Sequence, residues 1–291
     1  MFRLHCFCFF LLPVLFLISC APGPEIIIVP DNTAPPDFSV PELAKENYVN
    51  KVYITLLGRK PSDSEFSRGM ALLDENNAST ESREKFIDEV LVKPGFSQRM
   101  YEIARTEILN NVDTADITFQ IVIFTQLLSD PVYEPFYDLI ETEIGRLARL
   151  RDVPKKLENG EIDRIEMHRR MVDNFIYDEI NMGTQNFVLS MFEYFLGRYP
   201  TAKEEEVSIQ MVDGFNTVVF GEEGDSKAEF IEIFFESDNY FEGQVVNIYE
   251  DFLFRSPNSV EMGEGTEIYK TTLDYSTLLK TILAKDEFLG I

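Results

Sequence analysis

The chain has 291 residues, a formal net charge of −25, 45% hydrophobic residues and 25 phenylalanines. A hydrophobic content of this size excludes a disordered chain and provides a core for one large or two ordinary domains. Because nucleic acid and anionic lipid are polyanions that attract Lys and Arg, the acidic charge argues against both as partners.

Residues 1–19 have the pattern of a cleavable secretory signal. Arg3 is their only formally charged residue, and residues 7–18 form a nearly unbroken apolar stretch that is too short for a comfortable membrane-spanning helix. The stretch ends in the sequence LISC, whose last residue is Cys20, and this resembles the lipobox at which bacterial signal peptidase cuts before a lipid-modified cysteine. We therefore predict that Cys20 carries lipid and anchors the chain to a membrane of the bacterial envelope.

A proline-rich segment over residues 20–45 follows the predicted signal. Its prolines fix φ and remove backbone donors, so we expect an extended tether that spans up to about 75 Å. The prolines are Pro22, Pro24, Pro30, Pro35, Pro36 and Pro41. No aspartate follows Cys20, so an outer membrane is the favoured destination, and the sequence leaves both periplasm-facing and surface-facing orientations open.

A helical pattern occurs three times, at residues 46–100, 186–243 and 244–291. In each copy, apolar residues at i, i+3, i+4, i+7 and i+8 mark one buried stripe of an α-helix. An arginine and a proline follow, and then a side-chain N-cap with a glutamate at the third helical position, which starts a second helix. The recurring residues are Gly58, Arg59, Pro61 and Glu65, then Gly197, Arg198, Pro200 and Glu204, then Arg255, Pro257 and Glu261.

The three arginines stand where each first helix is predicted to end. The proline two residues later disfavours the α conformation at the residue between them, so the helices should end near Arg59, Arg198 and Arg255. We expect each guanidinium to face the negative end of its helix and to pair with the glutamate that follows. The alternative is that the arginines clamp a ligand.

The recurring motif resembles the DUF4214-type repeat of bacterial exported proteins and, more remotely, the linker domain of phycobilisomes. The resemblance is strongest at residues 47–96, weaker at 186–241 and weakest at 244–291, where Phe254 stands in place of the glycine. It implies a helical, non-enzymatic protein with a role in interaction or assembly.

Residues 101–185 lie between the first two copies and carry three further helix-length apolar patterns. These patterns cover residues 117–128, 136–150 and 162–180. Asn159-Gly160 predicts a turn between the last two of them. The sequence leaves open whether this region forms a separate domain or packs on the repeats.

Part of this region is basic within an acidic chain, because residues 146–170 contain eight Lys and Arg residues against five Asp and Glu residues. The basic stretch consists of Arg146, Arg149, Arg151, Lys155, Lys156, Arg164, His168, Arg169 and Arg170. An exposed basic face would dock an anionic partner. In the interpretation that we favour, the chain's own carboxylates neutralise it.

No catalytic or metal-binding pattern stands out. Cleavage before Cys20 removes the two other cysteines, which excludes disulfides, thiolate metal sites and cysteine nucleophiles. His168 has no nucleophile-elbow motif or zinc-ligand spacing around it, so we expect an ordinary surface or partner-bound histidine. The acidic segments 74–77 and 222–225 lack EF-hand spacing and are interpreted as turns. We predict no enzyme activity, no cofactor and no metal.

These patterns predict an all-α fold of three helical repeat units with an additional helical region, preceded by a signal peptide and a tether. The predicted function is a non-enzymatic lipoprotein, anchored through Cys20, that serves as an interaction or assembly module with another envelope protein. The alternative is a glycan-binding or carbohydrate-active lipoprotein. A broad exposed apolar patch would favour the first, whereas exposed aromatics beside paired carboxylates in a cleft would favour the second.

Overall fold

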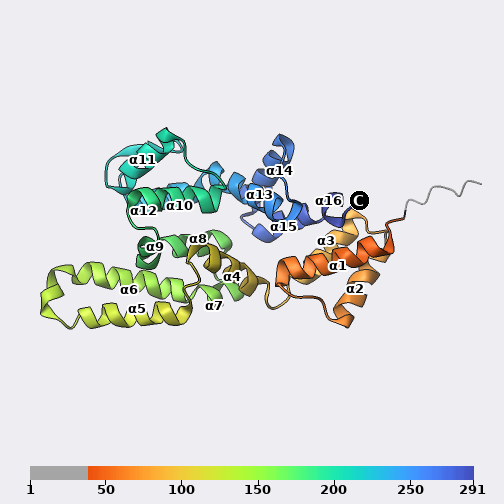
Figure 1. Ribbon diagram of the computed structural model, residues 1–291, viewed down its shortest axis with the longest axis horizontal. Helices are drawn as coiled ribbons and strands as arrows, with labels where there is room; N and C mark the ends of the chain where they lie inside the picture. Colours follow the sequence, from red (N-terminus) through yellow and green to blue (C-terminus); the bar gives the residue numbers. More distant parts are fainter. Residues whose placement is uncertain (1–38) are drawn as a thin grey trace, which may run out of the picture. The chain divides into compact units, whose positions relative to one another are not determined.

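Sixteen α-helices, one 3-10 helix and one two-stranded hairpin make up residues 39–291, the part of the chain that the computed structural model describes (Figure 1). The prediction of an all-α fold is confirmed for these residues. The predicted signal segment, the lipidation site Cys20 and most of the predicted tether lie outside the described residues. None of the helices in residues 39–291 is long and apolar enough to cross a membrane.

The first three helices are α1 (Glu42–Leu57), α2 (Asp63–Asp74) and α3 (Thr80–Leu91). Helix α1 begins at Glu42, so the predicted tether boundary at residue 45 is too late. The reason is local, because Pro41 precedes the first helical residue and the Glu42 carboxylate lies at the positive end of the helix dipole.

The recurring motif gives the same local structure at three places: between α1 and α2, between α10 (Thr184–Leu196) and α11 (Ala202–Val212), and between α13 (Asp238–Leu253) and α14 (Ser259–Thr272). Each first helix ends two residues before its arginine, and the residue between them has the left-handed conformation. These residues are Gly58 with φ 66°, Gly197 with φ 62° and Phe254 with φ 55°. Phe254 adopts this conformation at a cost of about 1 kcal/mol that glycine does not incur.

A small side chain recurs four residues after each motif glutamate. It is Gly69 in α2, Ser208 in α11 and Gly265 in α14. A Cβ atom at Gly265 would lie 2.8 Å from Val245, and one at Gly69 would lie 2.8 Å from Phe86. Ser208 is fully buried. The small residue therefore allows each second helix to pack closely on its neighbours.

The last helices of the chain return to the first ones. Helix α15 (Tyr275–Leu283) contacts α3, and α16 (Asp286–Leu289) contacts α1. The Tyr48 hydroxyl donates to the Leu283 carbonyl at 3.0 Å, and the rings of Tyr48 and Phe288 lie edge to face at 5.7 Å. These contacts close the hydrophobic core between the two ends of the described chain.

The middle region is helical, as predicted, and contains seven elements. Six of them are α-helices: α4 (Phe96–Ile108), α5 (Thr114–Leu127), α6 (Tyr137–Arg151), α7 (Val153–Glu158), α8 (Arg164–Val172) and α9 (Phe175–Ile180). The seventh, η1 (Pro131–Phe136), is a 3-10 helix between α5 and α6. The predicted helix at 162–180 is two helices, because the Asn174 side chain accepts a hydrogen bond from the Tyr177 backbone N–H and so starts a new helix. Helices α4 and α8 pack against α1 and α12 (Lys227–Glu236) respectively, so the region is packed on its flanking helices.

Two short strands were not predicted. Strands β1 (Thr217–Val219) and β2 (Glu222–Gly224) pair antiparallel around a turn at Phe220-Gly221, where both residues have positive φ. The interpretation of segment 222–225 as an acidic turn is therefore wrong, because most of it is strand β2. Segment 74–77 leads into a turn at the end of α2, as expected.

The core contains a cluster of aromatic rings from α10, α12, α13 and the β1–β2 turn. Phe234 is fully buried and contacts several of the other rings at centroid distances of 5.6 to 6.2 Å. The cluster consists of Phe192, Phe195, Phe220, Phe230, Phe234, Phe235 and Tyr240. It holds α10 and α13 together and thereby fixes one wall of the cavity described below.

Candidate functional site

The three motif arginines pair with the three motif glutamates. Arg59 reaches both oxygens of Glu65 at 2.8 and 2.9 Å. The corresponding distances are 3.0 and 2.7 Å for Arg198 and Glu204, and 2.7 and 2.7 Å for Arg255 and Glu261. The predicted pairing is thereby confirmed, and it occupies the guanidinium groups that a ligand clamp would need.

Two further contacts recur in each copy. Each arginine donates to the carbonyl of the residue after it at 3.1 or 3.2 Å. Each guanidinium also lies 5.0 to 5.4 Å from an aromatic ring centroid of the preceding helix. The rings belong to Tyr53, Phe192 and Tyr249. The arginine therefore joins the end of one helix to the start of the next, which is a structural role.

These pairs predict a pH dependence of stability. Pairing with arginine lowers the pKa of Glu204 and of Glu261 from 4.5 to about 2. A lowered pKa in the folded state stabilises the protein at pH values above 4.5, and this stabilisation is lost as the pH falls towards 2. Replacing both residues (Glu204→Gln, Glu261→Gln) should cost about 2 kcal/mol per site at pH 7 and flatten the fall of the unfolding free energy between pH 4.5 and 2.

Urea titrations at a series of pH values measure this effect. Glu264→Gln, at an exposed glutamate of α14, is the matched control and should leave the slope unchanged. Parallel curves for the double variant and the wild-type protein would show that the pairs do not contribute.

The basic stretch is largely neutralised by neighbouring carboxylates, as favoured from the sequence. Arg146 and Arg149 contact Asp173 at 3.3 and 3.9 Å, and Arg169 contacts Glu236 at 3.0 Å. The other ion pairs of the stretch are Arg146 with Glu143, Arg151 with Asp152, Lys156 with Glu161 and Arg170 with Glu166. Lys155 forms no ion pair in the described part of the chain. The side chains of Arg164 and His168 do not join this surface.

The expectation of a surface histidine is wrong. His168 is 2% exposed, because it lies on the inner face of α8, and its Nδ1 atom is 2.9 Å from the Tyr240 hydroxyl. Burial lowers the pKa of His168 well below its usual range, and the nearby Arg164 guanidinium lowers it further. The imidazole is therefore neutral and belongs to the core.

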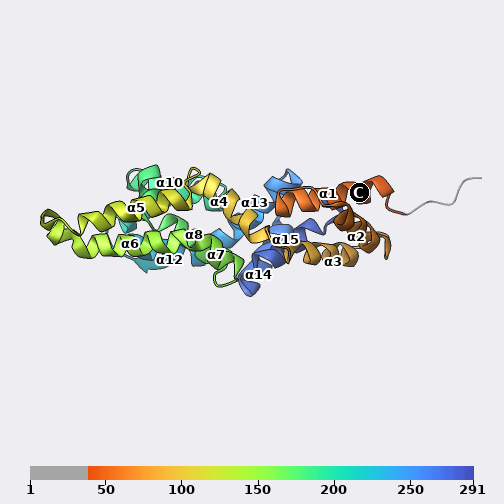
Figure 2. The ribbon, with the colours of Figure 1, turned by 90° about the horizontal axis from the view of Figure 1, so that it is seen from below.

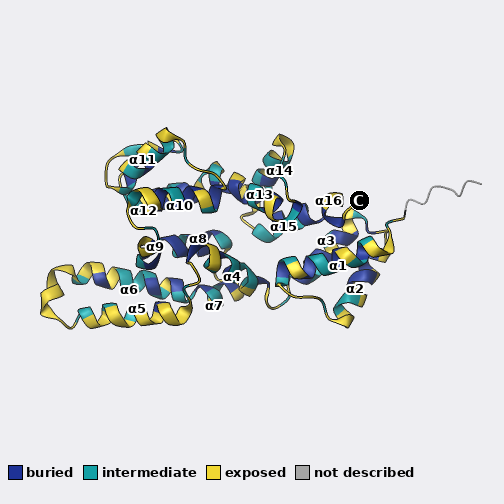
Figure 3. Ribbon diagram, in the orientation of Figure 1, coloured by how far each residue is buried: buried dark blue, intermediate teal, exposed yellow. Residues whose placement is uncertain are grey.

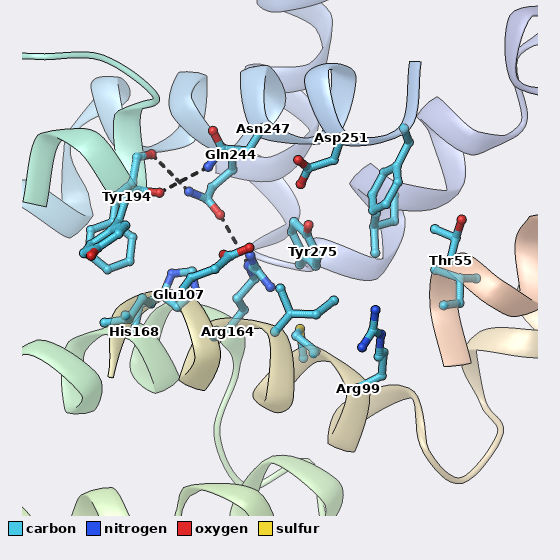
Figure 4. Close-up of a pocket in the computed structure, with 18 of the residues that line it drawn as sticks. Thr55, Arg99, Glu107, Arg164, His168, Tyr194, Gln244, Asn247, Asp251 and Tyr275 are labelled. Carbon is cyan, nitrogen blue, oxygen red and sulfur yellow. Dashed lines mark hydrogen bonds between the residues drawn. The ribbon is translucent and has the colours of Figure 1, made fainter. Parts of the chain in front are cut away.

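A cavity of about 80 Å³ lies beside His168, lined by helices α1, α4, α8, α10, α13 and α15 (Figure 4). Its polar lining includes Arg99 and Glu107 from α4, Arg164 from α8 and Asp251 from α13. Of these four residues, only Arg164 is a candidate from the sequence, as part of the basic stretch. The other three come from segments that are distant in the chain, and no local spacing connects them.

Arg164 is held firmly at the cavity. Its Nε donates to Gln244 Oε1 at 3.3 Å, and its guanidinium lies 4.0 Å from the centroid of the Tyr275 ring. Gln244 is 1% exposed and in turn donates to the Phe195 carbonyl at 3.2 Å. This support leaves the two terminal nitrogens of Arg164 without a hydrogen-bond partner among residues 39–291.

The two carboxylates of the cavity are also free of direct partners. Glu107 and Asp251 form no hydrogen bond or ion pair in the described part of the chain. Burial raises the pKa of both carboxyl groups, and the charge of Asp251 raises the pKa of Glu107 further, whereas the nearby Arg164 guanidinium lowers the pKa of both. No group of three or more His, Cys, Asp or Glu side chains within residues 39–291 is placed to hold a metal ion.

A second candidate site is the apolar hairpin, residues 114–151, formed by α5, η1 and α6 (Figure 2). Helix α5 buries only Ile117, although residues 117–129 contain no charged side chain. Large apolar side chains therefore face solvent along the hairpin, much of which is coloured as exposed in Figure 3. They are Phe119, Val122, Ile123, Val132, Tyr133, Phe136 and Leu139.

Comparison of the chain with protein families, with curated proteins and with solved structures gave no match. The fold and its sites define an all-α protein with a small charged cavity and an exposed apolar hairpin. The similarity to DUF4214-type repeats therefore stays a prediction from the sequence motif.

Proposed function

We propose that the protein is a non-enzymatic lipoprotein of the bacterial envelope that binds another envelope protein through the apolar hairpin. The observation that carries this proposal is the exposure of the hairpin side chains, which reaches 66% for Phe119 and 68% for Leu139. Contiguous exposed apolar surface on a soluble domain is typical of a binding site, and aromatic side chains contribute most of the binding energy in such sites.

The charge of the hairpin indicates the chemistry of the partner. Asp130, Glu134 and Asp138 are exposed around its tip, close in sequence to the apolar side chains. Carboxylates at this position oppose insertion into an anionic membrane surface. We infer a protein partner with an apolar groove whose rim carries Lys or Arg.

The anchor belongs to the same proposal. A lipid on Cys20 and a proline-rich tether would hold the folded residues near an outer membrane and leave the apolar hairpin free to reach a partner. The support for the anchor is the lipobox pattern of the sequence.

We favour this function over the glycan-directed alternative. That alternative requires exposed aromatics beside paired carboxylates in a cleft. Glu107 and Asp251 share a cavity of about 80 Å³, whereas ligand pockets usually measure about 300 to 1,000 Å³. The ring of Tyr275 stacks on Arg164 instead of standing free for a sugar.

Photo-crosslinking in cells tests the proposed function. A photo-reactive phenylalanine analogue is placed at Phe119 or Leu139, and Val260, which is 66% exposed on α14, serves as the matched control position. We expect one envelope protein to crosslink from both hairpin positions and not from residue 260, and Phe119→Glu to abolish its recovery in affinity purification. Equal crosslinking from all three positions, or none from the hairpin, would contradict the proposal.

The anchor is tested in the same cells. Replacing Cys20 by alanine should move the protein from the membrane fraction to the soluble fraction. Retention of this variant in the membrane fraction would argue against a lipid anchor.

A further inference from the structure

Two arginines that line the cavity lack a carboxylate partner among the described residues. In residues 39–291, every arginine except Arg99, Arg105 and Arg164 has a carboxylate oxygen within 4.0 Å. Two of these three line the same cavity, although the chain has 51 acidic residues. Guanidinium groups that lack a carboxylate partner in such an acidic protein indicate a ligand that supplies the anionic oxygen.

Both cavity arginines have unused donors. The terminal nitrogens of Arg164 are free, because Gln244 and the Tyr275 ring engage the rest of its guanidinium. The Nε atom of Arg99 is buried and has no hydrogen-bond partner. A buried donor without a partner destabilises the free protein, so a ligand oxygen bound to this donor would offset that cost.

The cavity also offers unused acceptors. Figure 4 shows Glu107 and Asp251 directed into the space that Arg164 occupies, from α4 and α13 on different sides. Neither carboxylate forms an ion pair with Arg99 or Arg164, so two positive and two negative groups of the described residues line this cavity without direct pairing. A ligand with one charge would satisfy only half of them.

We propose that this cavity binds a small zwitterion of the α-amino acid class, with its carboxylate on the free nitrogens of Arg164 and its ammonium group near Glu107 and Asp251. The small volume of the cavity, about 80 Å³, favours a ligand of the size of glycine or alanine. Met100 and Phe252 provide apolar surface for a methyl group. This inference does not depend on the function of the apolar hairpin.

Isothermal titration calorimetry on the full chain, purified in detergent, tests the proposal with three probes of similar size. L-Alanine carries both charges, propionate lacks the ammonium group, and ethylamine lacks the carboxylate. We expect L-alanine to bind at least about tenfold more tightly than either analogue, because each analogue lacks one of the two charged hydrogen-bonding groups.

Substitutions separate the two halves of the site. Arg164→Gln should abolish L-alanine binding, whereas Asp251→Asn should weaken L-alanine about tenfold and leave propionate unchanged. Arg105→Gln is the matched control, because Arg105 also lies on α4 without a carboxylate partner but is outside the cavity, where it donates to the Asn111 carbonyl. Circular dichroism confirms that each variant is folded, and Arg164→Lys provides a second, charge-conserving variant with weakened binding.

Two outcomes would overturn the proposal. If propionate binds as tightly as L-alanine, the cavity is a site for a simple anion. If none of the three probes binds, the charged groups hold only water.

Discussion

Replacing Gly243 by alanine is expected to cost about 4 kcal/mol or more of the unfolding free energy. The added Cβ atom would lie 2.1 Å from the Phe195 carbonyl oxygen and 2.7 Å from the Leu196 Cα atom. Both contacts are with backbone, so no side chain can rotate away, and helices α10 and α13 would have to separate. The separation would also displace Gln244, which follows Gly243 and holds Arg164 at the cavity.

Urea denaturation followed by circular dichroism measures this loss. Gly263→Ala is the matched control, because Gly263 lies in α14 and a Cβ atom there meets no other atom within 4 Å. Alanine at that helical position should raise stability by up to about 1 kcal/mol. A Gly243→Ala variant as stable as the wild-type protein would mean that α10 and α13 do not approach each other as closely as described.

Truncating Phe234 to alanine is the second change with a large expected effect, a loss of about 3 to 5 kcal/mol. Phe234 is fully buried at the centre of the aromatic cluster and makes edge contacts with Phe192 at 5.6 Å and Phe235 at 5.6 Å. The substitution removes these contacts and leaves a void that neighbouring rings cannot fill without moving.

The control for this variant is Phe215→Ala, which removes the same atoms from a side chain that is 64% exposed. Its effect should stay within about 0.5 kcal/mol. The midpoints of urea denaturation of the two variants give the comparison directly. Equal losses in both variants would indicate an effect on the unfolded chain, and not on the packed cluster.

The motif predictions succeeded because the interactions are local. Each arginine and its glutamate are six residues apart, and the proline and the N-cap between them determine the turn. The apolar spacing identified buried faces in the same way, since residues such as Val49 and Val188 lie on the stripe and are fully buried. Membership of the three copies in one repeat family remains a prediction, because shared local geometry does not establish it.

The amino-acid sequence does not predict the environment of residues that are enclosed or left exposed by distant segments of the chain. His168 was expected at the surface, but Phe195 and Tyr240 enclose it from helices that come later in the chain. The exposed face of α5 was likewise not predicted. Its apolar residues have the composition of a buried helix, and only the packing shows that α6 is its main neighbour.

The sequence by itself determined the helical class, the ends of the motif helices, their arginine–glutamate pairs and the acidic surface, because periodicity, capping and charge act over a few residues. Only the tertiary structure decided which charged side chains share the cavity and which apolar side chains remain exposed. Glu107, Arg164 and Asp251 are far apart in the chain, and they meet because α4, α8 and α13 pack with particular faces together. That choice of faces depends on close contacts such as the one at Gly243, which no local pattern records.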